Sequence, residues 1–226
     1  VSDRKNRRKS DETIYANVIC AFDIETTRLS EIEQSIMYIW QFAMLDIDTG
    51  YIVCVYGRYW DEFANLMRAL DTTGLSFMIF VHNLSYEFQW LRSILPFLED
   101  DVFPIKSRSI LKVIMGHERH LEFRCSYHQT HKSLDKLLKD YDVENKKLDY
   151  DYNIRRYPWT VLTRDEIDYC VNDVVGLVQA MHSRMVQGGD NLYTLPFTST
   201  GYVRRLARNA MKQYNFNKLH SMMCNY

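Results

Sequence analysis

The chain has 226 residues, of which 46% are hydrophobic and 25% are charged, and its formal net charge is −1. This composition is ordinary for a globular protein with a real core, and the chain has no low-complexity segment and fits one sizeable domain or one domain plus a short appendage. The five cysteines are widely spaced without a CxxC pair, which argues against a disulfide framework and for a reducing compartment. No apolar run approaches membrane-spanning length, and the polar, basic start lacks a secretory signal. We therefore expect a cytoplasmic protein that does not bind a membrane.

Strand and helix patterns alternate along the chain, after a basic arm at residues 1–14 that is predicted to be disordered. Apolar, β-branched and aromatic runs predict strands at 18–25, 37–47, 51–56 and 77–81, with two more within 105–126. The turn residues Asp48-Thr49-Gly50 predict a hairpin between the second and third strands. Apolar residues at helical spacing predict helices at 60–70, 83–95, 131–140 and 163–187. This order predicts an α/β fold, a mixed sheet with helices packed on its faces.

Two carboxylates lie on one face of the first predicted strand. Side chains alternate along a strand, so Asp23 and Glu25 point the same way while Phe22 and Ile24 point into the core. Paired carboxylates at the end of a buried strand repel each other and lose hydration, which a divalent cation between them offsets. The alternative is an ordinary strand end with two solvated acids.

Two later helices each supply another acid. Where the strand at 77–81 turns into a helix, Asn83 is suited to the N-cap position and Glu87 lies one turn later. A capping box at 163–166 opens a helix on which Tyr169 and Asp173, four residues apart, share a face. Taken singly, a capped helix with one stray acid is common.

Together, the acid pair, the single acid one turn into a helix and the Tyr-x-x-x-Asp spacing resemble the DEDDy class of 3′–5′ exonucleases. They are similar to the three motifs of the proofreading domain of family B DNA polymerases, in particular the protein-primed kind of bacteriophages and linear plasmids. The resemblance covers residues 15–205 and implies a ribonuclease-H-like mixed sheet flanked by helices. It places the exonuclease domain at 15–190, followed at 191–226 by a linker and basic helix that would begin a polymerase region.

Two further positions match the protein-primed subgroup, and two positions depart from the family. Lys147 stands where that subgroup carries a catalytic lysine, and Ser126 where it has a Ser or Thr that helps to hold single-stranded DNA. The second motif normally supplies Asp, whereas this chain has Glu87, and Tyr127 follows Ser126 where Leu is usual. No polymerase palm motif is found, so this chain alone is not expected to polymerise DNA.

The resemblance implies hydrolysis of phosphodiester bonds at the 3′ end of single-stranded DNA, with two divalent metal ions (Mg²⁺ or Mn²⁺) as cofactors. Tyr169 would orient the attacking water, because a phenol with a pKa near ~10 is a poor base, and Lys147 would offset charge on the phosphate. The partners implied are a 3′ DNA end and a polymerase domain in the same longer chain, encoded by a phage or mobile element. The metal ligands would be Asp23, Glu25, Glu87 and Asp173, and the substrate would contact Thr26, Asn83, Tyr86, Trp90 and Ser126, with Tyr86 and Trp90 stacking on bases.

Other interpretations of these residues stay open. The chain could be a nuclease-fold module that binds DNA with weak or no activity because of Glu87, or an exonuclease that trims RNA. His117-x-x-His120 and His128-x-x-His131 offer metal-ligand spacing, but neither pair has a cysteine partner, which disfavours structural zinc. The basic residues within 3–9 and 204–212 are suited either to phosphate contact or to a solvated surface.

Overall fold

The computed structural model of the protein describes residues 13–143, 151 and 153–213. Its centre is a seven-stranded sheet in the order β3-β2-β1-β4-β7-β6-β5. The β1–β4 and β4–β7 pairs are parallel, and the other neighbouring pairs are antiparallel. The mixed sheet confirms the predicted α/β class. The strands are β1 (Tyr15–Leu29), β2 (Gln34–Asp46), β3 (Ile52–Gly57), β4 (Ser76–Val81), β5 (Phe97–Lys106), β6 (Ser109–Met115) and β7 (Leu121–Cys125).

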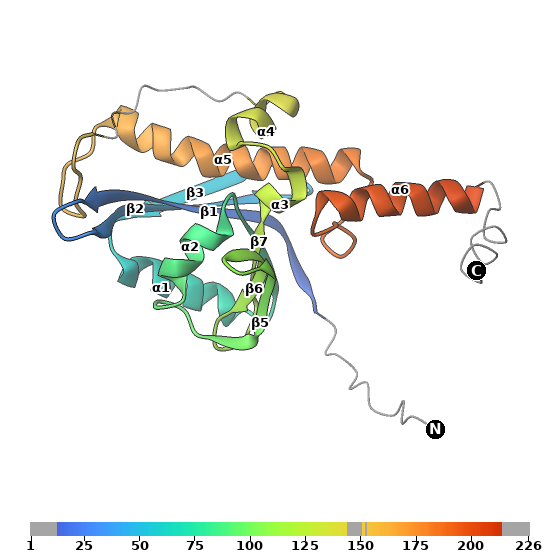
Figure 1. The fold of residues 1–226 in the computed structure, drawn as a ribbon, viewed down its shortest axis with the longest axis horizontal. Helices are drawn as coiled ribbons and strands as arrows, with labels where there is room; N and C mark the ends of the chain where they lie inside the picture. The colour runs from blue at the N-terminus through green and yellow to red at the C-terminus, as the bar shows by residue number, and fades with distance from the viewer. Residues whose placement is uncertain (1–12, 144–150, 152, 214–226) are drawn as a thin grey trace.

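Helices cover both faces of the sheet, as Figure 1 shows. The long α5 lies along one face with α4, and α1 lies along the opposite face with α2. The helix α6 extends away from the sheet beyond the end of α5. Within the described residues, no helix is both long enough and apolar enough to span a bilayer. The helices are α1 (Trp60–Asp71), α2 (Leu84–Leu91), α3 (Ser126–Thr130), α4 (Leu134–Asp140), α5 (Arg164–Gln187) and α6 (Ser199–Gln213).

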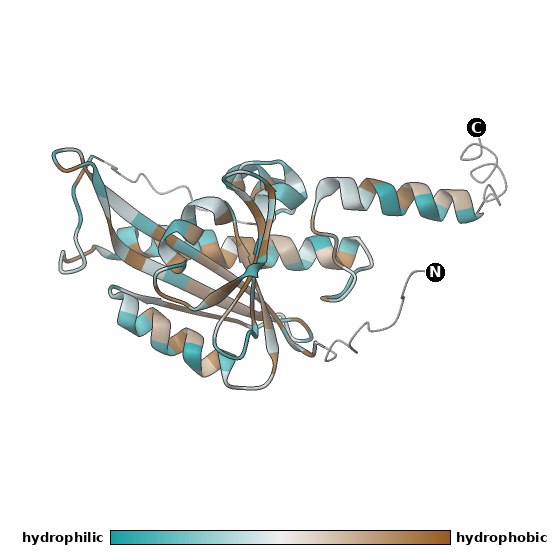
Figure 2. Ribbon diagram, turned by 60° about the horizontal axis from the view of Figure 1, so that its bottom comes forward, coloured by the Kyte–Doolittle hydropathy of each residue, from teal (hydrophilic) through white to brown (hydrophobic). Residues whose placement is uncertain are grey.

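Side chains on the two faces of β1 pack into two separate core clusters. Phe22 and Ile24 pack toward α1 and α2, whereas Ile19 and Ala21 pack toward α5. Burial of a large apolar side chain contributes about 1.5–3 kcal/mol, and the central strands are largely hydrophobic (Figure 2). The alternation continues along β1, so the side chains of Asp23 and Glu25 lie on the α5 face. The prediction that Asp23 and Glu25 share one face of β1, opposite to Phe22 and Ile24, is confirmed.

Two elements were not predicted, and one predicted helix is shorter. Strand β5 lacks the apolar pattern of a buried strand because it forms the edge of the sheet, where Leu98, Phe103 and Ile105 are exposed. It also contains Pro104, which is tolerated at an edge. Helix α3 spans only five residues, too few for a periodic signal. The helix predicted at 83–95 ends at Leu91, because the main chain turns there and the N–H groups of Ile94 and Leu95 both donate to the Leu91 carbonyl.

The segment after α5 packs against the domain. Leu192 and Leu195 are buried in the cluster that contains α5, and Arg205 of α6 forms an ion pair with Asp190. Packing therefore continues beyond the boundary predicted at residue 190. The arm predicted at 1–14 falls, except for residues 13 and 14, outside the described residues.

Candidate metal centre and active site

Three carboxylates from two elements meet where β1 passes under α5. One oxygen from each of Asp23, Glu25 and Asp173 lies within 4.8 Å of the others. The alternation of β1 brings the first two together, and a β-bulge follows directly between Glu25 and Thr26. The capping box of Thr163 and Glu166 fixes the start of α5, so Asp173 faces the strand about two turns later. Acids from the first strand and from the long helix α5, far apart in the sequence, thus form one cluster, as the motifs predict.

Glu87 completes the acidic cluster from the other side. It lies in the first turn of α2, directly after β4 ends, and only 5% of its surface is exposed. Its Oε2 atom is buried without a hydrogen-bond partner among the described residues. Glu87 stands outside the group of oxygens within 4.8 Å, yet its charge is near enough to raise the pKa of Asp23. The structure therefore brings all four predicted acids into one neighbourhood.

Burial raises the pKa values of all four carboxyl groups, and repulsion from neighbouring acids adds to it for Asp23, Glu25 and Glu87. Burial is the largest cause for each of them, and for Asp23 the charges of Glu25, Glu87 and Asp173 add to it, so its pKa lies well above 3.8. Burial and then Asp173 raise the pKa of Glu25 from 4.5 to about 7, against the opposing charge of Arg156. Burial raises the pKa of Glu87 to about 8 and that of Asp173 to about 6.

This cluster fits a divalent cation. Carboxylate oxygens are the ligands that Mg²⁺ and Mn²⁺ prefer, and a cation would satisfy the orphaned Glu87 oxygen and offset the repulsion. No other group of three such side chains in the described parts of the chain is close enough to hold a metal. The histidine pairs are engaged elsewhere: His120 Nδ1 lies 2.7 Å from the Asp71 carbonyl oxygen, and His128 Nε2 lies 3.0 Å from Ser109 Oγ.

Several predicted substrate contacts also gather near the acids. Thr26, just after the bulge, shares a hydrogen bond of 2.7 Å with the hydroxyl of Tyr86, which is 41% exposed. Asn83 precedes α2 as predicted, but its side chain makes no capping hydrogen bond and is exposed. It therefore has an amide available at the surface. Tyr169 lies on the same face of α5 as Asp173. It is partly buried against a small core cluster made of Tyr38, Ile39, Leu162 and Cys170.

Two further predicted contacts, the partly buried Trp90 and the buried Ser126, are packed within the protein. The ring of Trp90 stacks on Trp60, with centroids 6.2 Å apart, and packs against the core. Ser126 is fully buried, and its Oγ lies 3.0 Å from His82 Nδ1 and 3.4 Å from the Val81 carbonyl oxygen. In this conformation Trp90 is a packing residue, and the buried Ser126 hydroxyl is engaged inside the protein. Lys147 lies outside the described residues.

Two residues near the cluster were not anticipated from the sequence. Gln41 pairs directly with Asp23 across β1 and β2, is fully buried, and has no hydrogen-bond partner for either amide atom among the described residues. Its position between Trp40 and Phe42 in a hydrophobic strand is a signal that could have identified it. Arg156 is 3% exposed and contacts Thr27 and Glu166, residues too distant in sequence for a local pattern to connect.

Comparison with known proteins identifies structural relatives only. No family model and no curated protein sequence matches the chain. Phi29 DNA polymerase complexed with primer-template DNA (the post-translocation binary complex) matches with a TM-score of 0.69 and 18% identity, over 90% of this chain and 36% of that chain. The same polymerase complexed with single-stranded DNA matches with a TM-score of 0.68 and 17% identity, over 89% and 36%. Its orthorhombic crystal form matches with a TM-score of 0.59 and 19% identity, over 78% and 32%.

The level of identity shows a shared fold, and the chain spans about a third of the polymerase's length. The chain thus shares the mixed-sheet fold of the part of phi29 DNA polymerase that it matches.

Proposed function

We propose that this chain is a metal-dependent 3′–5′ exonuclease that removes nucleotides from the 3′ end of single-stranded DNA, as the proofreading domain of a family B DNA polymerase. The observation that carries the proposal is the convergence of Asp23, Glu25 and Asp173 within 4.8 Å, with Glu87 buried beside them. The structural likeness to a polymerase solved with single-stranded DNA supports this choice of substrate. The match to about a third of that polymerase supports a polymerase region in the same longer chain.

The roles of the acidic residues follow from their positions. Asp23, Glu25 and Asp173 would hold two divalent cations, Mg²⁺ or Mn²⁺, and Glu87 would hold the outer part of their coordination. Such cations supply an activated water and stabilise the charge that develops on the phosphate and the departing 3′ oxygen. The new P–O bond forms to the oxygen of water as the bond between phosphorus and the 3′ oxygen breaks. The water loses a proton to the solvent and the departing 3′ oxygen takes one up, which releases a nucleoside 5′-monophosphate and leaves a new 3′-hydroxyl end.

Other side chains would orient the reactants. Tyr169 lies one turn before Asp173, and its hydroxyl would hydrogen-bond the attacking water, because a phenol near pKa ~10 does not deprotonate water. Lys147 would place a positive charge beside the phosphate. Thr26, Asn83 and Tyr86 would hold the terminal nucleotide at the exposed side of the cluster.

Digestion of a 5′-labelled single strand tests this function. With Mn²⁺ or Mg²⁺ we expect a ladder of products that shorten from the 3′ end, and no products when a chelator is present. A strand whose 3′ end is blocked should persist. Binding of the strand without shortening would instead support a DNA-binding module. Faster digestion of an RNA strand of the same sequence would support RNA trimming.

Substitution of Tyr86 is expected to weaken DNA binding in two steps. Tyr86→Phe removes the hydrogen bond to Thr26 but keeps the ring, so affinity should fall about 2- to 10-fold. Tyr86→Ala also removes base stacking, so a further loss of about 5- to 100-fold is expected. Fluorescence anisotropy of a labelled oligonucleotide in chelator measures both. Tyr51→Ala is the control, since Tyr51 is 70% exposed beside the distant edge strand β3. Unchanged affinity of Tyr86→Ala would remove Tyr86 from the substrate site.

The digestion rate is expected to depend more on the negative charge of residue 87 than on the length of its side chain. Glu87→Asp restores the residue usual in the family and should digest within about tenfold of the unsubstituted chain, whereas Glu87→Gln should be about 10- to 100-fold slower because outer ligands tune a metal site to that extent. Single-turnover rates at saturating Mn²⁺ measure the difference. Equal rates for Glu87→Gln and the unsubstituted chain would contradict a role for this carboxylate.

A further inference from the structure

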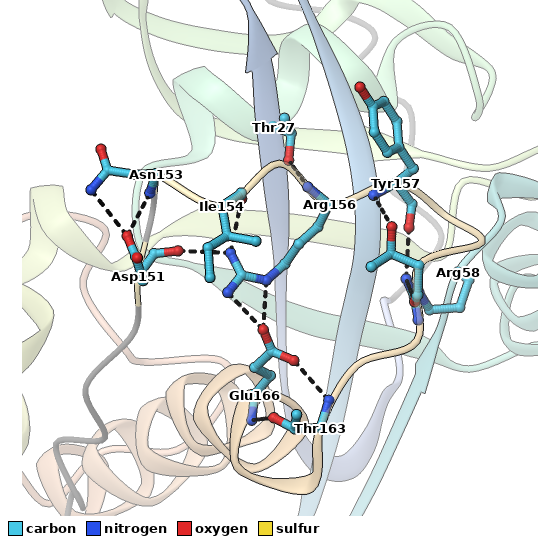
Figure 3. A network of polar contacts seen from close by, with 10 residues as sticks. Thr27, Arg58, Asp151, Asn153, Ile154, Arg156, Tyr157, Thr163 and Glu166 are labelled. Atoms are coloured by element: carbon cyan, nitrogen blue, oxygen red, sulfur yellow. Dashed lines mark hydrogen bonds and ion pairs between the residues drawn. The ribbon is translucent and has the colours of Figure 1, made fainter.

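A buried arginine joins the elements that carry the acidic cluster. Only 3% of Arg156 is exposed. Its Nε and Nη2 atoms lie 2.7 and 2.6 Å from Glu166 Oε1. Its Nη1 donates to the carbonyl oxygens of Asp151 at 2.8 Å and Ile154 at 3.0 Å. Figure 3 shows this guanidinium between the segment at 151–154 and the first turn of α5.

The main chain of Arg156 adds a third attachment. Its N–H donates to Thr27 Oγ1 at 3.0 Å, and Thr27 lies two residues beyond Glu25 on β1. Glu166 is itself the capping-box residue of α5, because its Oε2 accepts the N–H of Thr163 at 2.7 Å. One residue therefore links the end of the strand that carries Glu25 to the start of the helix that carries Asp173.

The contacts of Arg156 are better suited to positioning neighbouring elements than to stabilising the fold. Replacement of a buried ion pair by apolar side chains is often neutral or stabilising, so such a pair is weak evidence for a stabilising role. A planar guanidinium, however, can donate to a carboxylate and two carbonyls at once in fixed directions, which a lysine ammonium cannot reproduce. This geometry determines how far β1, α5 and the segment at 151–156 lie from one another.

We propose that Arg156 is a positioning residue of the exonuclease site, which sets the spacing between Glu25 on β1 and Asp173 on α5. The inference rests on the function proposed above.

Two nearby arginines provide matched controls. Arg58 holds the other end of the same segment, donating to the carbonyl oxygens of Tyr157 at 2.8 Å and Thr160 at 2.9 Å, and to that of Tyr38 on β2. Arg155 is adjacent in sequence but exposed, and it pairs with Glu31 at the surface. Arg58 therefore tests the stability of the segment, and Arg155 tests the loss of a nearby charge.

The test compares Arg156→Lys, Arg58→Lys and Arg155→Gln in the whole chain with Mn²⁺. For Arg156→Lys we expect the single-turnover rate at saturating oligonucleotide to fall about 10- to 100-fold, as for small displacements of reacting groups, while the oligonucleotide Kd stays within about twofold. Arg155→Gln should leave both unchanged. Arg58→Lys should lower Tm but leave the rate per folded molecule unchanged. A rate for Arg156→Lys equal to that of the unsubstituted chain, or reduced only in proportion to the folded fraction, would overturn the proposal.

Calorimetric titration with Mn²⁺ gives a readout that does not depend on digestion. Arg156→Lys should bind Mn²⁺ about 10- to 100-fold more weakly, the usual loss when groups that orient ligands are removed. If the unsubstituted chain binds Mn²⁺ but digests nothing, the proposed function fails, and Mn²⁺ affinity still decides the role of Arg156. If Arg156→Lys digests and binds Mn²⁺ normally, the positioning role fails while the function stands.

A second variant tests whether the pair acts as a unit. Glu166→Gln removes the charge but keeps an oxygen that can accept the N–H of Thr163. It should slow the reaction as Arg156→Lys does, and the double variant should be no slower than the slower single variant, because residues in one network are not additive. Additive losses in the double variant would contradict a joint role.

Discussion

Asp23→Asn is expected to slow digestion of a 3′-ended strand about 100- to 1000-fold and, at the same time, to stabilise the metal-free protein. Asp23 lies at the centre of the cluster, where burial and then the charges of Glu25, Glu87 and Asp173 oppose its ionisation and raise its pKa. Asparagine has a similar shape but removes one metal ligand. Loss of several kcal/mol of metal-assisted stabilisation corresponds to a rate reduction of about 100- to 1000-fold.

The stability of this variant should change in the opposite direction. Without metal, asparagine avoids the cost of holding the Asp23 carboxyl in this site, where burial and three nearby acids oppose its ionisation. A gain of about 1 kcal/mol raises Tm by about 2–4 °C in a chain of this size. Calorimetry in chelator at pH 8 measures the gain, and single-turnover assays with Mn²⁺ measure the rate. Asp168→Asn serves as the control, since Asp168 is exposed on the same helix. A variant that digests normally, or whose Tm falls, contradicts the account of the cluster.

The metal-free protein should lose stability as pH rises from 6.5 to 8, and Mn²⁺ should reverse the loss. Burial raises the pKa of Glu25 from 4.5 to about 7 and that of Glu87 from 4.5 to about 8. In this window the folded chain holds more protons than the unfolded chain, so the free energy of unfolding decreases with pH. Burial lowers the pKa of His82 from 6.5 to about 4, which gives the opposite slope between those values, so the comparison begins at 6.5.

Mn²⁺ competes with protons for the carboxylates, so its effect should be largest at pH 8. At a concentration of 100 times Kd, a cation stabilises the folded state by about 2.7 kcal/mol, which is about 5–10 °C in Tm. Calorimetric scans at pH 6.5 and 8, with Mn²⁺ or with chelator, give the four values needed. The double variant Asp23→Asn, Glu25→Gln should show little response to Mn²⁺. A Tm in chelator that is constant or rises with pH would show that the carboxylates are not buried together.

Local patterns predict orientation well in this protein. Strand alternation places Asp23 and Glu25 on one face, and a spacing of four places Tyr169 and Asp173 on one face of α5, because both depend only on backbone geometry. The convergence of the strand pair with Asp173, far along the chain, is not a local property, and it was predicted only by resemblance to a family. The capping box at Thr163 and Glu166 was predicted from four consecutive residues.

Contacts between segments that are far apart in the sequence could not be predicted from local patterns. Nothing in the local sequence distinguishes Arg156 from the other arginines, and its main-chain N–H donates to Thr27, 129 residues away. Strand β5 has the side-chain exposure of a sheet edge, so its apolar residues show no buried periodicity. Ser126 matches its motif position, but the structure buries its hydroxyl against His82, which a motif does not report.

The most direct test is a crystal structure of the chain soaked with Mn²⁺ and a short oligonucleotide that has a free 3′ end. The account predicts anomalous peaks for Mn²⁺ in contact with carboxylate oxygens of Asp23, Glu25 and Asp173, with the last phosphate of the strand beside them. Mn²⁺ bound elsewhere, or a 3′ end seated away from these three acids, would contradict it.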